Sequence, residues 1–318
     1  MSGLALGLHG GCGTLDRSLM SEAEWTESRE HIAAALRAGW RVLAAGGHSL
    51  DAVQATIMVL EDSPHFNAGH GAALTEASTH ELDASIMDGA TLAAGAVCAT
   101  TRIRNPIAAA RALLDRGQVL LLAGPAADHF AETVGLTIVE PSYFTTARRV
   151  ETLATLKRRA AEGTAARASE AEKHGTVGAV ARDANGNLAA GTSTGGFNNK
   201  PVGRVGDSPI IGAGTYARNG VCAVSCTGMG EYFIRNVAAY DVAARIMYGG
   251  ASVASAAGKL VHEVIASHGI GAGMIVLGAT GDPIAPFNTL GMYRGWVGAD
   301  GEMVVATHQE LHWQGRAA

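Results

Sequence analysis

The sequence predicts an α+β protein in which antiparallel sheets are covered by helices. The run from 176 to 194 divides into two apolar segments around the tetrapeptide DANG at 183–186, a strong hairpin signal. The run from 274 to 287 resembles a second hairpin, and apolar residues recur at helical spacing over 22–45. Hairpins join antiparallel neighbours, whereas a doubly wound parallel sheet needs crossover connections. We therefore expect antiparallel sheets with helices before and after the strands.

The first half contains alternating strand and helix signals. A short apolar strand at 4–9 runs into a glycine turn at 10–13, and a helix over 22–45 ends at Gly46-Gly47. Ser49 is a suitable cap for a second helix that ends at Glu61. The remaining elements are a glycine-rich loop at 66–75, a strand of small residues at 91–98, a helix that opens at Asn105-Pro106, and a short apolar run at 119–123.

The second half begins with the hairpin, whose turn chemistry predicts the register of its strands. A loop centred near Asn185 places Thr176 opposite Thr194, because the two lie equally far from the turn. The later elements are a strand at 221–226, helices at 231–248 and 253–268, and the hairpin at 274–287.

Composition favours an enzyme that acts on small molecules. The 318 residues are 47% hydrophobic and 17% charged, which indicates a globular chain long enough for a sizeable core. A net charge of −5 without a basic stripe excludes nucleic acid as the expected partner. The first residues lack a charged region typical of a signal peptide, and no segment approaches the ~18 apolar residues of a membrane span. We expect a cytoplasmic protein without a membrane partner.

The cysteines and glycines carry structural rather than redox signals. Cys12, Cys98, Cys222 and Cys226 show no zinc or redox spacing and are predicted to be small buried side chains. The 42 glycines exceed the average share of about 7%, and they are spread over many loops. Many close backbone approaches are therefore expected.

The step from Gly175 to Thr176 has the properties of a cleavage site followed by a nucleophile. The segment 157–174 contains no Val, Ile, Leu, Met or aromatic residue, so we expect it to be exposed and mobile. An N-terminal threonine carries its own base, since a free α-amino group has a pKa of about 7.7 to 8. Glycine before it tolerates strained backbone and leaves its carbonyl open to attack, which makes an N-to-O acyl shift feasible. The alternative is a loop that ends where a strand begins, and the dipeptide alone does not decide between them.

Two familiar motifs are excluded by their context. The residues 191–195 match G-x-S-x-G, and His9-Gly10-Gly11 could suggest the oxyanion loop of an α/β-hydrolase. That nucleophile elbow must turn directly into a helix, but the following residues are rich in Gly, Asn and Pro. No phosphate-binding P-loop motif is present.

Two further constellations suit an amino-acid substrate. Arg204 and Asp207 pair a guanidinium with a carboxylate, which can hold the α-carboxylate and α-ammonium of a zwitterion; the alternative is an ordinary surface ion pair. Thr227 and the glycines after it end a strand and open a helix, where backbone N–H groups can stabilise an oxyanion. Thr227 could equally act as a helix cap.

Several motifs in this order resemble the plant-type asparaginase and isoaspartyl aminopeptidase family of N-terminal nucleophile hydrolases. The resemblance covers nearly the whole chain and implies a four-layer αββα sandwich with two stacked, mainly antiparallel sheets. It implies a single domain, 1–318, cleaved into an α chain (1–175, with a mobile linker at about 157–175) and a β chain (176–318), and a homodimer of αβ units. The motifs are HGGCG (9–13), FNAGHGA (66–72), HELDASIMDG (80–89), GTVGAVARDANGNLAAGTSTGG (175–196), GRVGDSPIIGAG (203–214), CTGMGE (226–231) and PFNTLGMYR (286–294).

The resemblance also implies roles for individual residues. Thr176 matches the nucleophile and Thr194 the threonine that orients it. The other matches are Asn67 close to the nucleophile, Arg204 and Asp207 for the substrate's α-carboxylate and α-amino group, Thr227 and Gly228 for the oxyanion hole, and Gly230 for a substrate contact. A loop resembles one that holds a structural sodium ion through main-chain carbonyls, here those of Leu60, Glu61, Ser63, Phe66, Ala68 and His70. No cofactor is expected in the chemistry itself.

The implied reaction is hydrolysis of the side-chain amide of L-asparagine, or of the isopeptide bond of β-aspartyl dipeptides, with release of L-aspartate. The sequence does not rank the two substrates. Alternatives are a glycosylasparaginase-like or threonine-aspartase-like enzyme, disfavoured by His174 before the Gly-Thr step and by the matching loops, and an uncleaved homologue that only binds ligand. Cys12, Thr14, His70 and Leu290 depart from the usual residues, and none of them removes a catalytic group.

Overall fold

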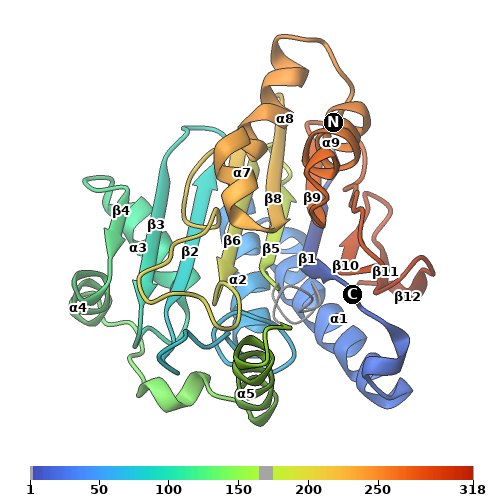
Figure 1. Ribbon diagram of the computed structural model, residues 1–318. Helices are drawn as coiled ribbons and strands as arrows, with labels where there is room; N and C mark the ends of the chain where they lie inside the picture. Colours follow the sequence, from blue (N-terminus) through green and yellow to red (C-terminus); the bar gives the residue numbers. More distant parts are fainter. Residues whose placement is uncertain (1–2, 165–174, 318) are drawn as a thin grey trace.

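Two β-sheets lie face to face between two layers of helices in the computed structural model, which describes residues 3–164 and 175–317 (Figure 1). Within these residues the large sheet has the order β12-β11-β10-β1-β5-β6-β2-β3-β4, and only the β3–β4 pair is parallel. Its strands are β1 (Ala5–Gly13), β2 (Leu82–Asp88), β3 (Ala94–Thr100), β4 (Leu121–Ala123), β5 (Val177–Arg182), β6 (Leu188–Thr194), β10 (Gly291–Val297), β11 (Glu302–Ala306) and β12 (His312–Arg316).

The small sheet is antiparallel, has the order β7-β8-β9, and packs on the centre of the large one. It consists of β7 (Thr215–Arg218), β8 (Cys222–Gly228) and β9 (Ala272–Gly278). Its inner face meets β1, β5 and β6. The nucleophile candidate at the start of β5 therefore lies between the two sheets.

The helices form the outer layers (Figure 1). The large sheet is covered by α1 (Glu22–Ala44), α2 (Ser49–Glu61) and α3 (Pro106–Arg116). The small sheet is covered by α8 (Ala238–Met247) and α9 (Val253–Lys259), preceded by α7 (Gly230–Asn236). Two further helices, α4 (Pro125–Thr133) and α5 (Ala147–Ala161), lie at the edge of the molecule. This arrangement confirms the expected αββα sandwich.

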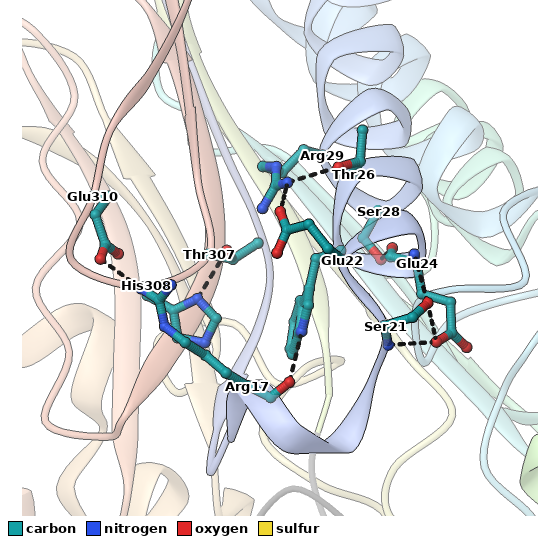
Figure 2. A network of polar contacts seen from close by, with 11 residues as sticks. Arg17, Ser21, Glu22, Glu24, Thr26, Ser28, Arg29, Thr307, His308 and Glu310 are labelled. Carbon is teal, nitrogen blue, oxygen red and sulfur yellow. Dashed lines mark hydrogen bonds and ion pairs between the residues drawn. The ribbon is translucent and has the colours of Figure 1, made fainter.

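The first turn of α1 is fixed at both its cap and its flank. Ser21 and Glu24 form a capping box, in which each side chain accepts a hydrogen bond from the other residue's backbone N–H. Arg17, just before the helix, pairs with Glu310 of the segment after β11, and its carbonyl accepts a hydrogen bond from the Trp25 indole (Figure 2). The end of α1 that faces the active-site loops is thus anchored to the distant C-terminal strands.

The hairpin register agrees with the prediction. Val177 pairs with Ser193 and Arg182 with Leu188, so the same register places Thr176 opposite Thr194. The antiparallel contact of the 274–287 run is also present, as bridges from β9 to Ile284 and Phe287 rather than as a full second strand.

Other local expectations differ from the structure. The glycines at 10–13 do not form a turn: β1 continues to Gly13 with a register shift between His9 and Gly11. The predicted helix at 231–248 is interrupted at Val237, whose φ is 46°, and the helix at 253–268 continues past α9 as wider and then tighter turns. The polar stretch HELDASIMDG contains β2, a strand that was not predicted.

The linker before Thr176 differs in part from its expected mobile form. Residues 157–161 are the last residues of α5, because arginine, lysine and alanine favour helix even where little apolar surface is available. Residues 165–174 lie outside the described residues.

The cysteines and the hydropathy of the helices agree with what the composition predicts. Cys12, Cys98, Cys222 and Cys226 are buried, as predicted, and form no disulfide among the described residues. Among the helices in residues 3–164 and 175–317, none is long and apolar enough to cross a bilayer.

Candidate active site

Thr176 and Thr194 meet where β5 begins and β6 ends. The Thr176 hydroxyl donates to the Thr194 Oγ1 at 3.1 Å, and Thr194 donates in turn to the carbonyl oxygen of Gly175 at 3.2 Å. The backbone N–H of Gly196 donates to the Thr194 hydroxyl at 2.9 Å and fixes its orientation. Thr194 thus connects the candidate nucleophile to the carbonyl of the bond that it would attack.

Asn67 holds the same carbonyl from the other side. Its Nδ2 donates to the Gly175 oxygen at 2.7 Å and to the Gly196 oxygen at 2.6 Å, while its Oδ1 accepts from the backbone N–H of Ala73 at 2.7 Å. All its polar atoms are occupied, so the amide is held in place. Two donors directed at one carbonyl oxygen are suited to stabilising negative charge that develops there.

The backbone around Gly175 leaves no space for larger residues. A Cβ on Gly11, whose φ is +103°, would lie 2.9 Å from the Gly175 Cα and 3.1 Å from the Thr176 nitrogen. A Cβ on Gly175 would lie 2.9 Å from the Cβ of Asn67. The register shift in β1 therefore brings the glycine strand directly against the Gly175–Thr176 bond.

A small, narrow pocket opens on the Thr176 side of this bond. It brings together five of the predicted site residues. Its lining consists of Thr176, Thr194, Gly196, Phe197, Arg204, Gly206, Asp207, Ser208 and Gly228. The hairpin, the loop after β6 and the end of β8 all contribute to this one cavity.

The two remaining predicted residues near this pocket lie just behind its wall. A Cβ on Gly230 would lie 2.8 Å from the Asp207 Oδ1, so a glycine is required to admit that carboxylate. The Thr227 hydroxyl accepts a hydrogen bond from the Cys12 N–H at 3.4 Å. Gly228, next along the chain, has φ +150°, and a Cβ there would lie 2.7 Å from Phe233.

Asp207 is a buried carboxyl that faces the pocket. Burial raises its pKa to about 7, while the Arg204 charge opposes this shift. Among the described residues its Oδ2 has no hydrogen-bond partner. A buried carboxyl oxygen without a partner is costly, and a cationic ligand would supply the missing contact.

Arg204 is paired with Glu231 rather than with Asp207. Its Nε and Nη2 donate to the two Glu231 oxygens at 3.0 and 2.9 Å, and its guanidinium lies 4.6 Å from the centre of the Phe197 ring. The alternative interpretation, an ordinary surface ion pair between Arg204 and Asp207, is therefore wrong. Sequence reasoning missed Glu231, although it follows Gly230 in the first turn of α7 and could have been noticed as a carboxylate beside the proposed arginine.

A continuous row of buried polar side chains connects the two sheets beneath the pocket. The His9 ring lies 2.9 Å from the Ser225 hydroxyl, which lies 2.7 Å from Thr192; Thr215 donates to Thr192, and Ser85 to Thr215 at 2.8 Å. Burial lowers the pKa of His9 to about 3, against a smaller opposing effect of the Thr176 backbone. The sequence signal was present as single hydroxyl residues inside apolar strands, but a pairing between distant strands was needed to interpret it.

The candidate sodium loop folds so that several carbonyls point toward its glycines. A Cβ on Gly69 would lie 2.3 Å from the Glu61 oxygen, and one on Gly71 would lie 2.8 Å from the Phe66 oxygen. The Glu61 oxygen also accepts from the His70 N–H at 2.7 Å. This loop, here called the carbonyl cradle, is the candidate cation site, and two of its predicted carbonyl ligands lie close to its glycines. The residues predicted for it are Leu60, Glu61, Ser63, Phe66, Ala68 and His70.

A second group of side chains has the composition of a metal site. Glu27, His31 and His65 each offer one ligand atom, and these atoms lie within 4.8 Å of one another. Glu27 and His31 are one turn apart on α1, and His65 lies in the loop after α2. The group is separate from the pocket that contains Thr176.

The chain is similar to known proteins over most of its length. The profile of a family described as asparaginase matches residues 2–307. An isoaspartyl peptidase of Escherichia coli (strain K12) is 45% identical over 299 residues, which cover 93% of each chain. A probable isoaspartyl peptidase/L-asparaginase 2 of Arabidopsis thaliana is 39% identical over 327 residues, 96% of this chain and 99% of the other. The isoaspartyl peptidase/L-asparaginase of Homo sapiens is 40% identical over 255 residues, 80% and 81% of the two chains. This chain therefore belongs to the asparaginase family.

Proposed function

We propose that this chain is a threonine hydrolase that activates itself by cleavage before Thr176 and then releases L-aspartate from L-asparagine and β-aspartyl dipeptides. The names of its relatives support this assignment. The observation that carries it is the contact of the Thr176 hydroxyl with Thr194, which also donates to the Gly175 carbonyl. Nucleophile, orienting group and scissile carbonyl are thus in one hydrogen-bonded set.

Self-cleavage begins with attack of the Thr176 Oγ on the Gly175 carbonyl carbon. The oxyanion forms where Asn67 and Thr194 already donate hydrogen bonds. The C–N bond then breaks, the Thr176 nitrogen takes the proton that the hydroxyl lost, and an ester remains. Water hydrolyses this ester, which leaves a Gly175 carboxylate and a free Thr176 amine. The products are an α chain, 1–175, and a β chain, 176–318, of one domain.

The freed amine then serves as the base for substrate hydrolysis. The Thr176 hydroxyl attacks the side-chain carbonyl of the substrate, and its proton passes to the amine and on to the leaving nitrogen. Asp207 holds the substrate α-ammonium, for which its unpartnered Oδ2 is suited, and Arg204, oriented by Glu231, holds the α-carboxylate. Thr227 and Gly228 stabilise the oxyanion, Gly230 leaves space for Asp207, and water finally releases aspartate.

The test follows freshly purified protein on a denaturing gel over several days. Wild type yields fragments 1–175 and 176–318 together with the appearance of aspartate-releasing activity, whereas Thr176→Ala stays intact and inactive. Hydrolysis by a chain that never cleaves would contradict the mechanism. An uncleaved wild type that binds aspartate without hydrolysis would instead support the non-enzymatic alternative.

Three further assignments accompany this function. The carbonyl cradle at 60–70 holds a structural sodium ion, so exchange of Na⁺ for a bulky organic cation lowers the melting temperature. The enzyme is a homodimer of αβ units, which light scattering after gel filtration measures. Its four buried cysteines form no disulfide among the described residues, which suits a reducing compartment, and we place the protein in the cytoplasm, which fractionation of cells tests.

A further inference from the structure

A second, larger cavity lies on the Gly175 side of the scissile bond. It is open to solvent, and its empty space is about 590 Å³ when the open mouth is included. Gly11, Asn67 and Gly175 belong to its lining, whereas Thr176 belongs to the lining of the smaller pocket, so the two residues of the scissile bond border different spaces. The complete lining consists of Gly10, Gly11, Cys12, Leu15, Met20, Trp25, Pro64, His65, Phe66, Asn67, Arg148, Arg149, Gly175 and Tyr293.

Two guanidinium groups lie in the wall of this cavity. Arg148 and Arg149 come from the first turn of α5, and neither forms an ion pair with a carboxylate in the described parts of the chain. The Nε of Arg149 donates to the Gly71 carbonyl at 2.6 Å, which fixes the side chain and leaves its Nη atoms available. Burial lowers the pKa of Arg149 to about 10, and the neighbouring Arg148 charge adds to this effect. An anion that entered the cavity would offset both the burial of the Arg149 charge and its repulsion by Arg148.

Three aromatic side chains that are almost fully buried, Trp25, Phe66 and Tyr293, belong to the remaining wall. Trp25 and Tyr293 have ring centres 5.9 Å apart, and Phe66 packs edge-on against Tyr293. The Trp25 indole donates a hydrogen bond to the carbonyl of Arg17, and Arg17 is in turn held by Glu310 (Figure 2). The cavity therefore combines a fixed aromatic surface with two cations, which suits an amino acid that carries a carboxylate and an apolar side chain.

The chemistry of the reaction directs the leaving group toward this cavity. The Thr176 amine must donate a proton to the leaving nitrogen, so that nitrogen lies within hydrogen-bond reach of the Thr176 N. The acyl part of the substrate occupies the pocket of Arg204 and Asp207. Beyond the Thr176 nitrogen lies Gly11, where a Cβ would come within 3.1 Å of that nitrogen. Gly11 belongs to the wall of the larger cavity, and release of Gly175 opens the path between the two spaces.

We propose that this cavity binds the leaving amino acid of a β-aspartyl dipeptide, with Arg148 and Arg149 holding its α-carboxylate and Trp25 and Tyr293 contacting its side chain. The proposal rests on the function proposed above and makes Arg148 and Arg149 specificity-determining residues. L-Asparagine releases only ammonia, which does not reach the guanidinium groups. The two substrates therefore depend differently on this wall.

The experiment compares kcat/KM on β-aspartyl-leucine, β-aspartyl-leucinamide and L-asparagine. Hydrogen bonds to a charged partner are worth about 1.5 to 3 kcal/mol, so wild type prefers the free acid to the amide by roughly ten- to a hundredfold. Arg148→Gln and Arg149→Gln each reduce that preference, and the double variant, which has neither cation, abolishes it. L-Asparagine hydrolysis and self-cleavage stay within about twofold of wild type. Arg158→Gln, an exposed arginine on the same helix but outside the cavity, is the matched control.

Each contrary outcome is distinguishable. Equal losses on all three substrates would assign the arginines a structural role, and an unchanged preference in the double variant would place the leaving group elsewhere; either result overturns the proposal. A cleaved wild type that hydrolyses none of the three substrates would refute the proposed function itself, and the subsite with it.

Discussion

At the scale of single residues, the Thr194 hydroxyl and the Asn67 amide hold the Gly175 carbonyl by hydrogen bonds. Thr194 and Asn67 both donate to it, and Thr194 also accepts from the attacking hydroxyl. The register of the hairpin predicted the Thr176–Thr194 contact, because side chains alternate strictly along a strand. The bond from Asn67 to Gly175 joins residues 108 positions apart, and no local pattern could have predicted it.

The pH dependence of kcat/KM is a prediction at this scale. In the proposed mechanism the α-ammonium of the substrate requires ionised Asp207, whose pKa burial raises to about 7. Attack requires a neutral Thr176 amine, and the reference pKa of such an amine is about 7.7 to 8. Both groups must lose a proton, so activity falls as the pH decreases through these values. Below pH 7 the logarithm of kcat/KM should approach a slope of two against pH.

The measurement is kcat/KM on L-asparagine between pH 5 and 9 at constant ionic strength. The slope of log kcat serves as an internal control and should approach one, because bound substrate keeps Asp207 ionised. A limiting slope of one in kcat/KM would contradict the raised pKa or the role of Asp207.

At the scale of the elements, the two sheets are joined by hydrogen bonds as well as by apolar packing. Ser225 on β8 connects His9 on β1 with Thr192 on β6. Apolar runs and turn residues predicted β1, β3, β4, β5, β6, β8 and β9, whereas β2, β7, β10, β11 and β12 were not predicted. The break between α7 and α8 was not predicted either, because Val237 adopts a positive φ that its side chain disfavours and that only tertiary packing can impose. The strand β2 was missed because its buried face carries Asp83 and Ser85, which look exposed in sequence.

Substitution Ser225→Ala tests the contribution of this buried row. It leaves His9 and Thr192 without a shared partner, and unsatisfied buried groups cost about 1–3 kcal/mol each. We expect a melting temperature lower by several degrees, measured on the Thr176→Ala background so that all molecules remain a single chain. Ser255→Ala, on the exposed side of α9, is the control and should leave it unchanged. An unchanged melting temperature for Ser225→Ala would show that water or a neighbour replaces the hydroxyl.

At the scale of the whole molecule, the cleavage proposed after Gly175 would produce two chains whose strands interleave in one sheet. Along the order β12-β11-β10-β1-β5-β6-β2-β3-β4, groups of strands from after the cut alternate with groups from before it. The pairs β10–β1, β1–β5 and β6–β2 each join one fragment to the other. The resemblance to a known family predicted this sandwich correctly, whereas hairpins and periodicity alone indicated only antiparallel sheets with helical cover.

The fragments should therefore remain together after cleavage. Gel filtration in native buffer is expected to give one peak that contains both chains in equal amounts, and only denaturant should separate them. Thr176→Ala provides the reference elution volume for an uncut chain. Separation of the fragments in native buffer would show that these strand pairs do not hold the cleaved molecule.

With the proposed cut, the interleaved sheet would also make unfolding of the active enzyme kinetically irreversible. In the precursor, pairing of β1 with β5 is an intramolecular event, with a loop-closure cost that depends only weakly on the length between them. After the cut the same pairing is a bimolecular encounter, so recovery from unfolding slows with dilution and competes with aggregation. The lifetime of the active enzyme is then governed by how slowly it unfolds, while its assembly occurs once, during folding of the uncut chain.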